Sequence, residues 1–419
     1  MGESGRQRVT VIGAGIVGTS TALFLQRDGH EVTLLDPVSP GHMTSFGNAG
    51  VISYYSLLPV PQPGLLQKLP AMLMDPTSSL SIRWAYLPQL LPWLLRFAMN
   101  CRQSKFHAGT EAMAALTTRA GQAHDILIQQ CGLADLVRPG GWLKVARSKE
   151  AVLASTLLER EAYDRHGLPY EILDRKAVSD LEPALAVDLV AGVHLTANRA
   201  VQLPHLYTEG IARTFLERGG KWLQASAEGF GFDGERIDRV ATTGGEIATD
   251  TVVLATGAYG KKLAAIGRTP VPINAERGYH VVMPHPETTL RRPTYVVEGG
   301  FVMAPMIPGI RLTGGVELAS PRAAPNFRRI RRLAEKARQF VPALTGEILS
   351  EWQGARPSLP DTVPVIGRSP RTPNLYLAFG HQHVGLTLGP LTGVLIADLV
   401  AGRTPPIDMT PYAPDRSFV

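Results

Sequence analysis

The chain has 419 residues, 44% of them hydrophobic and 19% charged, which is enough for two connected domains with a sizeable core. Its two cysteines, Cys101 and Cys131, form no CxxC pair and have no His cluster nearby, which argues against a disulfide framework and against a metal site. The net charge of +6 favours anionic substrates or acidic lipid headgroups. The polar first residues show no targeting signal, so the expected location is cytoplasmic.

The first elements along the chain alternate between strand and helix. Residues 9–12, Val-Thr-Val-Ile, predict a buried parallel strand. A helix is expected from about 17 to 27, ended by Gly29, and a second strand over 31–35. This order of strand, helix and strand is typical of a Rossmann-type unit.

The turn between the first strand and the helix has the glycine spacing GxGxxG, which indicates dinucleotide binding. Gly13 permits the tight turn, Gly15 lets a pyrophosphate approach the backbone, and Gly18 lets the helix pack closely on the strand. The free N–H groups of the helix N-terminus attract the phosphates. An acid at the end of the second strand can accept hydrogen bonds from the ribose hydroxyls. It argues against a 2′-phosphate at this place and therefore disfavours NADP. The residues expected at this site are Gly13, Gly15, Ile16, Val17, Gly18 and Asp36.

Three further loops are suited to contact with a flavin. A small, glycine-rich loop over 44–50 follows the second strand, and an apolar strand over 251–255 leads into a Thr-Gly-Ala turn. A glycine-rich loop over 380–390 precedes an apolar helix expected from about 391 to 401, whose N-terminus would stabilise negative charge on a reduced flavin. These loops favour FAD over NAD. The residues expected to contact FAD there are Thr44, Ser45, Asn48, Ala49, Gly50, Thr256, Gly257, Gly385, Leu386 and Thr387.

Five motifs in order make the chain similar to the D-amino acid oxidase-like flavoproteins. They are VIGAGIVG with Asp36, TSFGNAG, the ATGA turn at 255–258, GARPSLPDTVPVIG at 354–367 and GHQHVGLTLGP at 380–390. The likeness covers nearly the whole chain and is closest to the small-subunit type of bacterial D-amino acid dehydrogenase. Several ordered motifs are far more specific than any one of them.

The resemblance implies an α/β fold in which a Rossmann-type FAD-binding domain is interwoven with an α+β substrate domain that carries a mixed or antiparallel sheet. The FAD-binding domain would comprise residues 1–140, 195–262 and 345–419, and the substrate domain 141–194 and 263–344. Asn48 stands where histidine-linked relatives carry the attaching His, and no Cys follows Cys131. The resemblance therefore implies FAD that is held non-covalently.

The carboxylate of an amino acid is best bound by the two parallel N–H donors of an arginine. Arg356 stands where the resemblance places such an arginine; the alternative is a structural ion pair, for example with Asp361. Tyr279 is a candidate to hold the same carboxylate, or is an ordinary sheet tyrosine. On a strand, Arg277 would share the direction of Tyr279 and offer a second cation, whereas His280 would point the other way.

Two histidines, His381 and His383, lie in the glycine-rich loop and are candidates for contact with the flavin or the substrate, although a loop histidine is more often a scaffold. A charge on either near pH 7 would tune the pH optimum. Tyr54 and Tyr55 are further candidates. The predicted catalytic set is Arg356, Tyr279 and His383.

The expected chemistry is hydride transfer from the substrate's α-carbon to flavin N5, followed by hydrolysis or release of the imine. This needs no obligatory base, and no acid–base pair stands out. The substrate would be a D-amino acid, with the cyclic D-proline and D-hydroxyproline as candidates because the relatives accept them. The alternatives are an oxidase of glycine, sarcosine or another secondary amine, an FAD-binding subunit of an electron-transfer complex, and an NAD-dependent dehydrogenase, which the C-terminal loop disfavours.

Residues 84–95, WAYLPQLLPWLL, are strongly apolar and are flanked by Arg83 and Arg96. The segment is too short and too interrupted by proline to span a bilayer. It predicts either packing in the core or in a homo-oligomer, or docking at the inner face of a membrane. Docking would fit an enzyme that passes electrons to a quinone or the respiratory chain.

The densest basic run extends from Arg328 to Arg338 and predicts a helix with one solvated face. Ile330, Leu333 and Phe340 would form its buried side. No aromatic stacking motif accompanies the run, so nucleic acid is not an expected partner.

Overall fold

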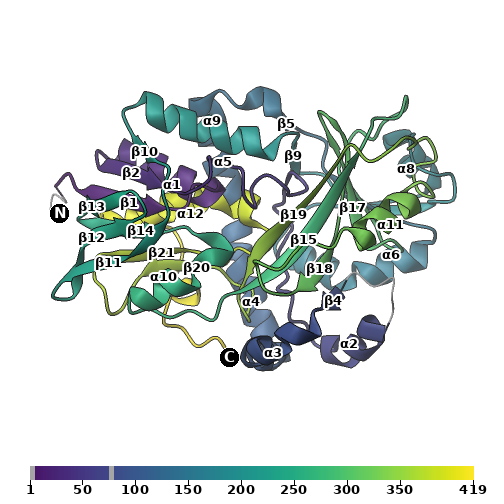
Figure 1. Cartoon of the computed structure of the whole chain (residues 1–419). Helices are drawn as coiled ribbons and strands as arrows, with labels where there is room; N and C mark the ends of the chain where they lie inside the picture. Colours follow the sequence, from purple (N-terminus) through teal and green to yellow (C-terminus); the bar gives the residue numbers. More distant parts are fainter. Residues whose placement is uncertain (1–4, 75–79) are drawn as a thin grey trace.

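The computed structural model describes residues 5–74 and 80–419. Figure 1 shows two sheets side by side, a parallel one that holds the first strands of the chain and a larger one that holds long antiparallel strands. Each sheet takes strands from distant parts of the sequence, so the chain crosses repeatedly between them. The expected α/β architecture with a Rossmann-type part is confirmed.

The parallel sheet has six strands in the order β10-β2-β1-β14-β21-β20, and its edge strand β20 is antiparallel. Its strands are β1 (Arg8–Ile12), β2 (Glu31–Leu35), β10 (Lys221–Leu223), β14 (Thr251–Leu254), β20 (Val365–Arg368) and β21 (Leu375–Phe379). Both faces of the sheet are covered, which explains the short runs of Val, Ile and Leu. The carboxyl ends of the parallel strands lie together, where sheets of this type bind ligands.

Helices cover one face of this sheet and a small antiparallel sheet covers the other. The helical layer is α1 (Ile16–Arg27), α5 (Ala120–Cys131), α9 (Pro204–Glu217) and α12 (Gly385–Val400). The opposite layer is α10 (Lys261–Ile266) with β11 (Ala227–Asp233), β12 (Arg236–Thr242) and β13 (Gly245–Ala248). The expected helix after β1 is confirmed, and Gly29 follows it with φ +90°.

The second sheet has eight strands in the order β19-β15-β18-β17-β16-β6-β8-β7, and β4 pairs with β18 as a ninth. Its strands are β4 (Leu80–Ile82), β6 (Trp142–Ala146), β7 (Glu171–Leu173), β8 (Ala191–Leu195), β15 (Asn274–Met283), β16 (Thr294–Val296), β17 (Phe301–Met306), β18 (Gly309–Leu318) and β19 (Ser350–Ser358). One face packs on α11 (Arg328–Ala337), where Ile330 and Phe340 are buried as expected and Leu333 is partly buried. The other face borders the cavity described below.

The remaining elements connect or flank the two sheets. They are β3 (Val51–Ile52), β5 (Val137–Arg138), β9 (Arg199–Val201), α2 (Leu65–Met74), α3 (Leu87–Asn100), α4 (Gln103–Thr117), α6 (Lys149–Ser155), α7 (Leu157–Arg165), α8 (Arg175–Leu181), and the 3-10 turns η1 (Trp84–Tyr86), η2 (Ala134–Leu136), η3 (Gly257–Tyr259) and η4 (Thr410–Tyr412). Helices α2 and α3 lie together at the edge of the molecule (Figure 1). Within residues 5–74 and 80–419, no helix is both long and apolar enough to cross a membrane.

The last helix begins earlier than the sequence predicts, at Gly385 instead of about residue 391. Its early residues include Gly389 and Pro390, which are poor helix formers, so the sequence of this segment predicts a loop. Close packing on α1 explains the glycines, because a Cβ at Gly389 would lie 3.0 Å from Ile16 and one at Gly393 would lie 2.9 Å from the backbone of Ser20. Tertiary packing therefore overrides local propensity here.

The division into two domains stays a prediction. Most strands of the nine-stranded sheet come from 141–194 and 263–344, as the division expects. Strands β4 and β19 also belong to this sheet, although their residues, 80–82 and 350–358, fall within the ranges expected for the FAD-binding domain.

Candidate active site

A cavity of about 1230 Å³ lies between the two sheets. It is lined by the turns after β1, β2, β14 and β21, by one face of the nine-stranded sheet, and by apolar residues of α2 and α3. The volume exceeds the roughly 300–1,000 Å³ typical of small-ligand pockets. It therefore has room for a dinucleotide together with a small substrate.

The glycine turn after β1 forms one end of the cavity. Gly13 has φ +111°, and a Cβ there would lie 2.4 Å from the carbonyl oxygen of Ala255. A Cβ at Gly18 would lie 1.7 Å from the carbonyl oxygen of Gly13, so Gly18 serves close packing and does not line the cavity. Gly15 does line it, together with Ile16 and Val17 from the first turn of α1.

Asp36 connects the end of β2 to this turn. Its carboxylate accepts hydrogen bonds from the backbone N–H groups of Ala14 at 2.8 Å and Val38 at 2.9 Å. Burial raises the pKa of Asp36, and these two hydrogen bonds oppose the rise. Asp36 also lines the cavity, and each carboxylate oxygen can accept a second hydrogen bond, so a ribose hydroxyl still finds an acceptor there.

The loop over 44–50 is held in one shape by its own side chains. Asn48 donates to the carbonyl of Ser45 and accepts from the N–H of Gly50, both at 2.8 Å. Arg311, on β18, donates to the carbonyls of Phe46 at 3.0 Å and Asn48 at 2.7 Å. Four of the predicted contacts line the cavity, whereas Gly50 does not; the four are Thr44, Ser45, Asn48 and Ala49.

The N-terminus of α12 and the turn after β14 complete this end of the cavity. Gly385, Leu386 and Thr387 line it, and the first N–H groups of a helix have no partner inside the helix. Thr256 and Gly257 line it from the other side. The hydroxyl of Thr256 is buried and has no hydrogen-bond partner within the described ranges, which marks a place for a ligand.

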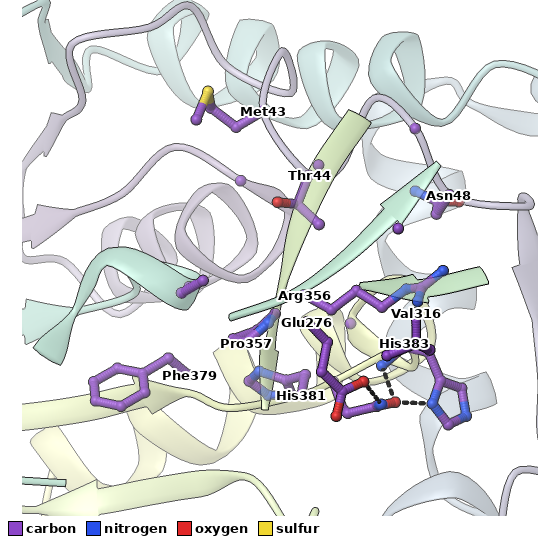
Figure 2. Close-up of a pocket in the computed structure, with 18 of the residues that line it drawn as sticks. Met43, Thr44, Asn48, Glu276, Val316, Arg356, Pro357, Phe379, His381 and His383 are labelled. Carbon is purple, nitrogen blue, oxygen red and sulfur yellow. Dashed lines mark hydrogen bonds between the residues drawn. The ribbon is translucent and has the colours of Figure 1, made fainter. Parts of the chain in front are cut away.

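Arg356 lies on β19, and its guanidinium crosses the neighbouring strand β15 (Figure 2). It donates to the carbonyl of Gly315 at 3.1 Å, and a Cβ at Gly278 would lie 2.5 Å from its guanidinium nitrogen. Asp361 pairs instead with Arg416 at 2.9 Å, so the alternative of an Arg356–Asp361 ion pair is wrong. Burial lowers the pKa of Arg356, while the charge of Glu276 opposes that change.

A hydrogen-bonded chain of Glu276, Gln382 and His383 lies beside Arg356 on the cavity wall (Figure 2). Glu276 accepts from the amide of Gln382 at 2.6 Å and from the hydroxyl of Ser358 at 2.7 Å. The side-chain oxygen of Gln382 accepts the backbone N–H of His383 at 2.6 Å and also contacts the ring nitrogen Nδ1 of that residue. Burial raises the pKa of Glu276.

Tyr279 lines the cavity, but its hydroxyl already has partners. It donates to Glu317 at 2.6 Å and accepts the N–H of Asn326 at 3.3 Å. Arg277 points to the same carboxylate, with 2.9 Å between its Nη1 and Oε2 of Glu317. The second candidate cation is therefore neutralised, and it does not line the cavity. His280 points the other way, as expected, and contacts the carbonyl of Gly47 at 3.0 Å.

Both loop histidines line the cavity, but they differ in exposure: His381 is buried and His383 is exposed. Burial lowers the pKa of His381 to about 3, so His381 carries no charge near pH 7. The expectation that its charge tunes the pH optimum near neutrality is therefore wrong for His381 and stays a prediction for His383. Tyr54 and Tyr55 do not line the cavity; their hydroxyls contact Arg199 at 2.8 Å and the carbonyl of Pro169 at 2.5 Å.

Residues 8–399 match the family described as FAD dependent oxidoreductase, DAO, which covers most of the chain and agrees with the dinucleotide end of the cavity. The chain belongs to this FAD-dependent oxidoreductase family. Two curated members support the assignment over nearly their full length. The D-amino-acid oxidase of Bradyrhizobium diazoefficiens is 34% identical, covering 98% of this chain and 99% of that protein. The D-amino acid dehydrogenase 2 of Mesorhizobium japonicum is 31% identical, covering 96% and 98%.

A solved structure shows the same fold. The glycine oxidase from Geobacillus kaustophilus matches with a TM-score of 0.75 at 22% identity, covering 98% of this chain and 99% of that one. The protein is thus an FAD-dependent oxidoreductase of the DAO family. The cavity fits the family's cofactor, because glycines leave room for the phosphates, two helix N-termini border it and the buried hydroxyl of Thr256 has no partner among the residues that the structure describes.

Several cavity residues were not expected from the sequence. They are Glu276, Gln382, Thr313 and Trp352 on the wall, and Arg311 behind the loop over 44–50. The alternation of side chains along β15 could have indicated Glu276 as a site residue. Glu276 lies two positions before Gly278 and therefore faces the same side of the strand, where the side chain of Arg356 lies. A register shift between Arg277 and Tyr279 interrupts the alternation, and Tyr279 lines the cavity as well, so counting in steps of two from Tyr279 does not lead to Glu276.

Proposed function

We propose that the protein oxidises a D-amino acid with bound FAD, cyclic ones such as D-proline or D-hydroxyproline included. The observation that carries the proposal is Arg356, a half-buried cation on the cavity wall with one protein acceptor, the carbonyl of Gly315, within the described ranges. An arginine on a cavity wall with free N–H donors is suited to bind a carboxylate through two parallel hydrogen bonds. The names of the two curated relatives support the D-amino acid class.

Under this proposal, FAD and the protein chain have different tasks. FAD, when bound, accepts the hydride from the substrate's α-carbon. The chain holds FAD with the glycine turn, Asp36, the loop over 44–50 and the N-terminus of α12, and it orients the substrate with Arg356. Tyr279 covers the cavity from β15, and the exposed His383 lies at its wall as a hydrogen-bonding group.

The test is anaerobic bleaching of the bound flavin near 450 nm. The holoenzyme is mixed with paired D- and L-amino acids, glycine, sarcosine and the hydroxyproline isomers. Bleaching by D-isomers and not by their L-partners is the expected result. Bleaching by glycine or sarcosine would instead favour a secondary-amine oxidase, and no bleaching by any compound would favour an electron-transfer subunit.

FAD is bound without a covalent link under this proposal. Asn48 is a hydrogen-bonding residue, both cysteines are buried outside the cavity lining, and His42 pairs with Glu209 at 2.6 Å. Acid precipitation of the yellow holoenzyme should therefore leave all of the flavin in the supernatant. Yellow colour that stays with the washed pellet would contradict this.

The proposed electron acceptor is a quinone of the respiratory chain, reached at an anionic membrane surface. The large apolar side chains exposed on α2, η1 and α3 form what we term the α2–α3 surface: Leu66, Leu73, Met74, Trp84, Leu91, Leu95 and Met99. Helix α3 also buries Leu90 and Trp93, so it is apolar on both sides, and no residue of α2 is buried. A water-exposed helix that is apolar all round calls for an apolar partner.

Charge favours an anionic lipid as that partner. Between residues 40 and 110 the sequence holds one acid, Asp75, which lies outside the described residues, and five basic residues. Of these five, Arg83 pairs with Glu317, which leaves Lys68, Arg96, Arg102 and Lys105 to meet the lipid. Apolar residues of α2 and α3 also line the cavity, among them Leu69, Met72 and Leu94. An apolar acceptor that enters from the lipid would thus reach the cavity along an apolar path.

A further inference from the structure

Glu276 is a buried carboxylate on the cavity wall to which the proposed function gives no role. It is 4% exposed and lies on β15 directly opposite Arg356 of β19. Its oxygens accept one hydrogen bond each from protein groups in the described ranges, those of Ser358 and Gln382. A carboxylate has about four acceptor positions, so part of its capacity is open toward the cavity.

The nearest charge to Glu276 is Arg356, but the two do not form a direct ion pair. The guanidinium crosses Gly278 toward the carbonyl of Gly315, whereas the carboxylate turns toward Gln382 (Figure 2). The other acids that line the cavity within the described chain are Asp36, after β2, and Glu228, on β11, both on the side of the parallel sheet.

Two opposite charges, at paired positions of neighbouring strands on one cavity wall, match the two charges of an amino acid. Its carboxylate and its ammonium group sit on the same carbon, so each can meet one wall charge. Buried charges are costly unless paired, and a zwitterion between Arg356 and Glu276 pairs all four charges. A carboxylic acid without an amino group would leave Glu276 unpaired.

We propose that Glu276 binds the amino group of the substrate while Arg356 binds its carboxylate, so that Glu276 selects amino acids over carboxylic acids that lack the amino group. The inference rests on the proposed function, because it assumes an amino acid in this cavity. The competing explanation is structural: Glu276 would merely hold Gln382 and Ser358 in place. The two explanations predict different responses to a pair of matched ligands.

The experiment compares D-alanine with propanoate, which differ in the amino group alone. Affinities are measured anaerobically from the rise in unfolding temperature of holoenzyme whose flavin has been reduced beforehand with dithionite, so that D-alanine cannot be oxidised during the titration. The wild type should bind D-alanine about tenfold or more tightly than propanoate, the value of one charge-assisted hydrogen bond. Equal affinities in the wild type would overturn the proposal without any variant.

Glu276→Gln gives the sharper result. It should weaken D-alanine binding by about tenfold or more, whereas propanoate should bind more tightly because an anion beside Arg356 is gone. Weakening of both ligands would show a structural role and overturn the proposal. Ser358→Ala is the matched control, because it removes one hydrogen bond to Glu276 but keeps its charge, and it should keep the preference for D-alanine.

Failure of this inference can be told apart from failure of the proposed function. If Glu276→Gln does not retain FAD, Glu276→Asp is tested in its place, and it should keep a reduced preference for D-alanine over propanoate. The proposal would be contradicted if a flavin-loaded Glu276→Asp variant bound propanoate normally but had lost all preference for D-alanine. If no amino acid bleaches the wild-type flavin, the proposed function fails, while the ligand titrations still decide what Glu276 recognises.

Discussion

Gly278 determines where the guanidinium of Arg356 lies. The side chain of Arg356 crosses β15 at the one place where no Cβ stands in its way, because a Cβ at Gly278 would lie 2.5 Å from it. The nearest atoms belong to the end of a flexible side chain, so a larger residue would move Arg356 without disturbing the backbone.

Gly278→Ala should therefore weaken substrate binding and leave the fold intact. The displaced guanidinium loses its aligned donors, and we expect the KM for the amino acid to rise by about tenfold, the value of roughly one charge-assisted hydrogen bond. Steady-state kinetics on the substrate found by bleaching gives the measurement. Gly229→Ala, on β11 with open space around its Cβ position, is the control. Unchanged KM in Gly278→Ala would remove Arg356 from the substrate site.

At this scale the sequence predicted the cofactor residues better than the substrate residues. The glycine turn and Asp36 are local, because a strand, a tight turn and a helix fix their positions within a short stretch of chain. Glu276, Gln382 and Arg356 come together from three distant segments, β15, the loop before α12 and β19. Their meeting depends on strand register, which composition and spacing do not reveal.

Two buried histidines tie elements around the cavity to each other. His124, on α5, contacts the carbonyl of Thr387 in α12 at 3.0 Å and the hydroxyl of Tyr207 at 2.9 Å. His280, on β15, contacts the carbonyl of Gly47 in the loop over 44–50. Burial lowers the pKa of His124 to about 4 and that of His280 to about 3.

These elements should lose stability in acid. Between pH 6.5 and those lowered pKa values the unfolded chain binds protons that the folded chain does not, so the free energy of unfolding falls as the pH is lowered. Above pH 6.5 the two histidines have no such effect. For His124 the loss amounts to about 3 kcal/mol by pH 4.

Urea unfolding at a series of pH values measures this loss. His124→Gln should flatten the fall in unfolding free energy between pH 6.5 and about 4, whereas the exposed His107→Gln should not. Identical pH slopes in wild type and His124→Gln would show that His124 is not held neutral in the folded protein.

The start of α12 shows why elements with glycine are hard to place from sequence. Local propensity argues for a loop up to residue 390, yet the helix extends back to Gly385 because glycines let it lie against α1. The earlier start matters for the site, since it brings the helix N-terminus to the cavity at Gly385, Leu386 and Thr387.

For the molecule as a whole, the α2–α3 surface is the feature that calls for a partner. The holoenzyme should sediment with phosphatidylglycerol vesicles at low salt and much less with phosphatidylcholine vesicles, because its charge there is basic. Leu91→Glu with Leu95→Glu should reduce vesicle binding by about a hundredfold or more, since two leucine side chains inserted in the lipid contribute about 3 kcal/mol or more. Leu157→Glu, an exposed leucine on α7, is the control.

Equal binding of the double variant would place the contact elsewhere. If the wild type ignores vesicles but forms dimers that Leu91→Glu with Leu95→Glu separates, a second copy of the chain covers this surface, which is the alternative drawn from residues 84–95. Size-exclusion chromatography of the same proteins distinguishes the two cases.

The order of motifs along the chain predicted the architecture, because four of the five motifs follow a strand of the parallel sheet or begin a helix beside it, whereas the motif at 354–367 begins on β19 of the nine-stranded sheet. It did not predict that β4 and β19 join the nine-stranded sheet. Strand partners that are far apart in sequence are selected by the folded structure, and short strands such as Leu80–Ile82 carry no pattern of their own.

The two faces of the nine-stranded sheet have separate tasks, and this makes the protein a convenient scaffold for engineering. Positions such as Tyr295, Val302 and Thr313 face the cavity, while their neighbours along the same strands, such as Val296, Met303 and Leu312, pack beneath α11. A library restricted to the cavity-facing positions would change which substrate is accepted and leave the hydrophobic core untouched. New specificities could then be selected without a concurrent loss of folding.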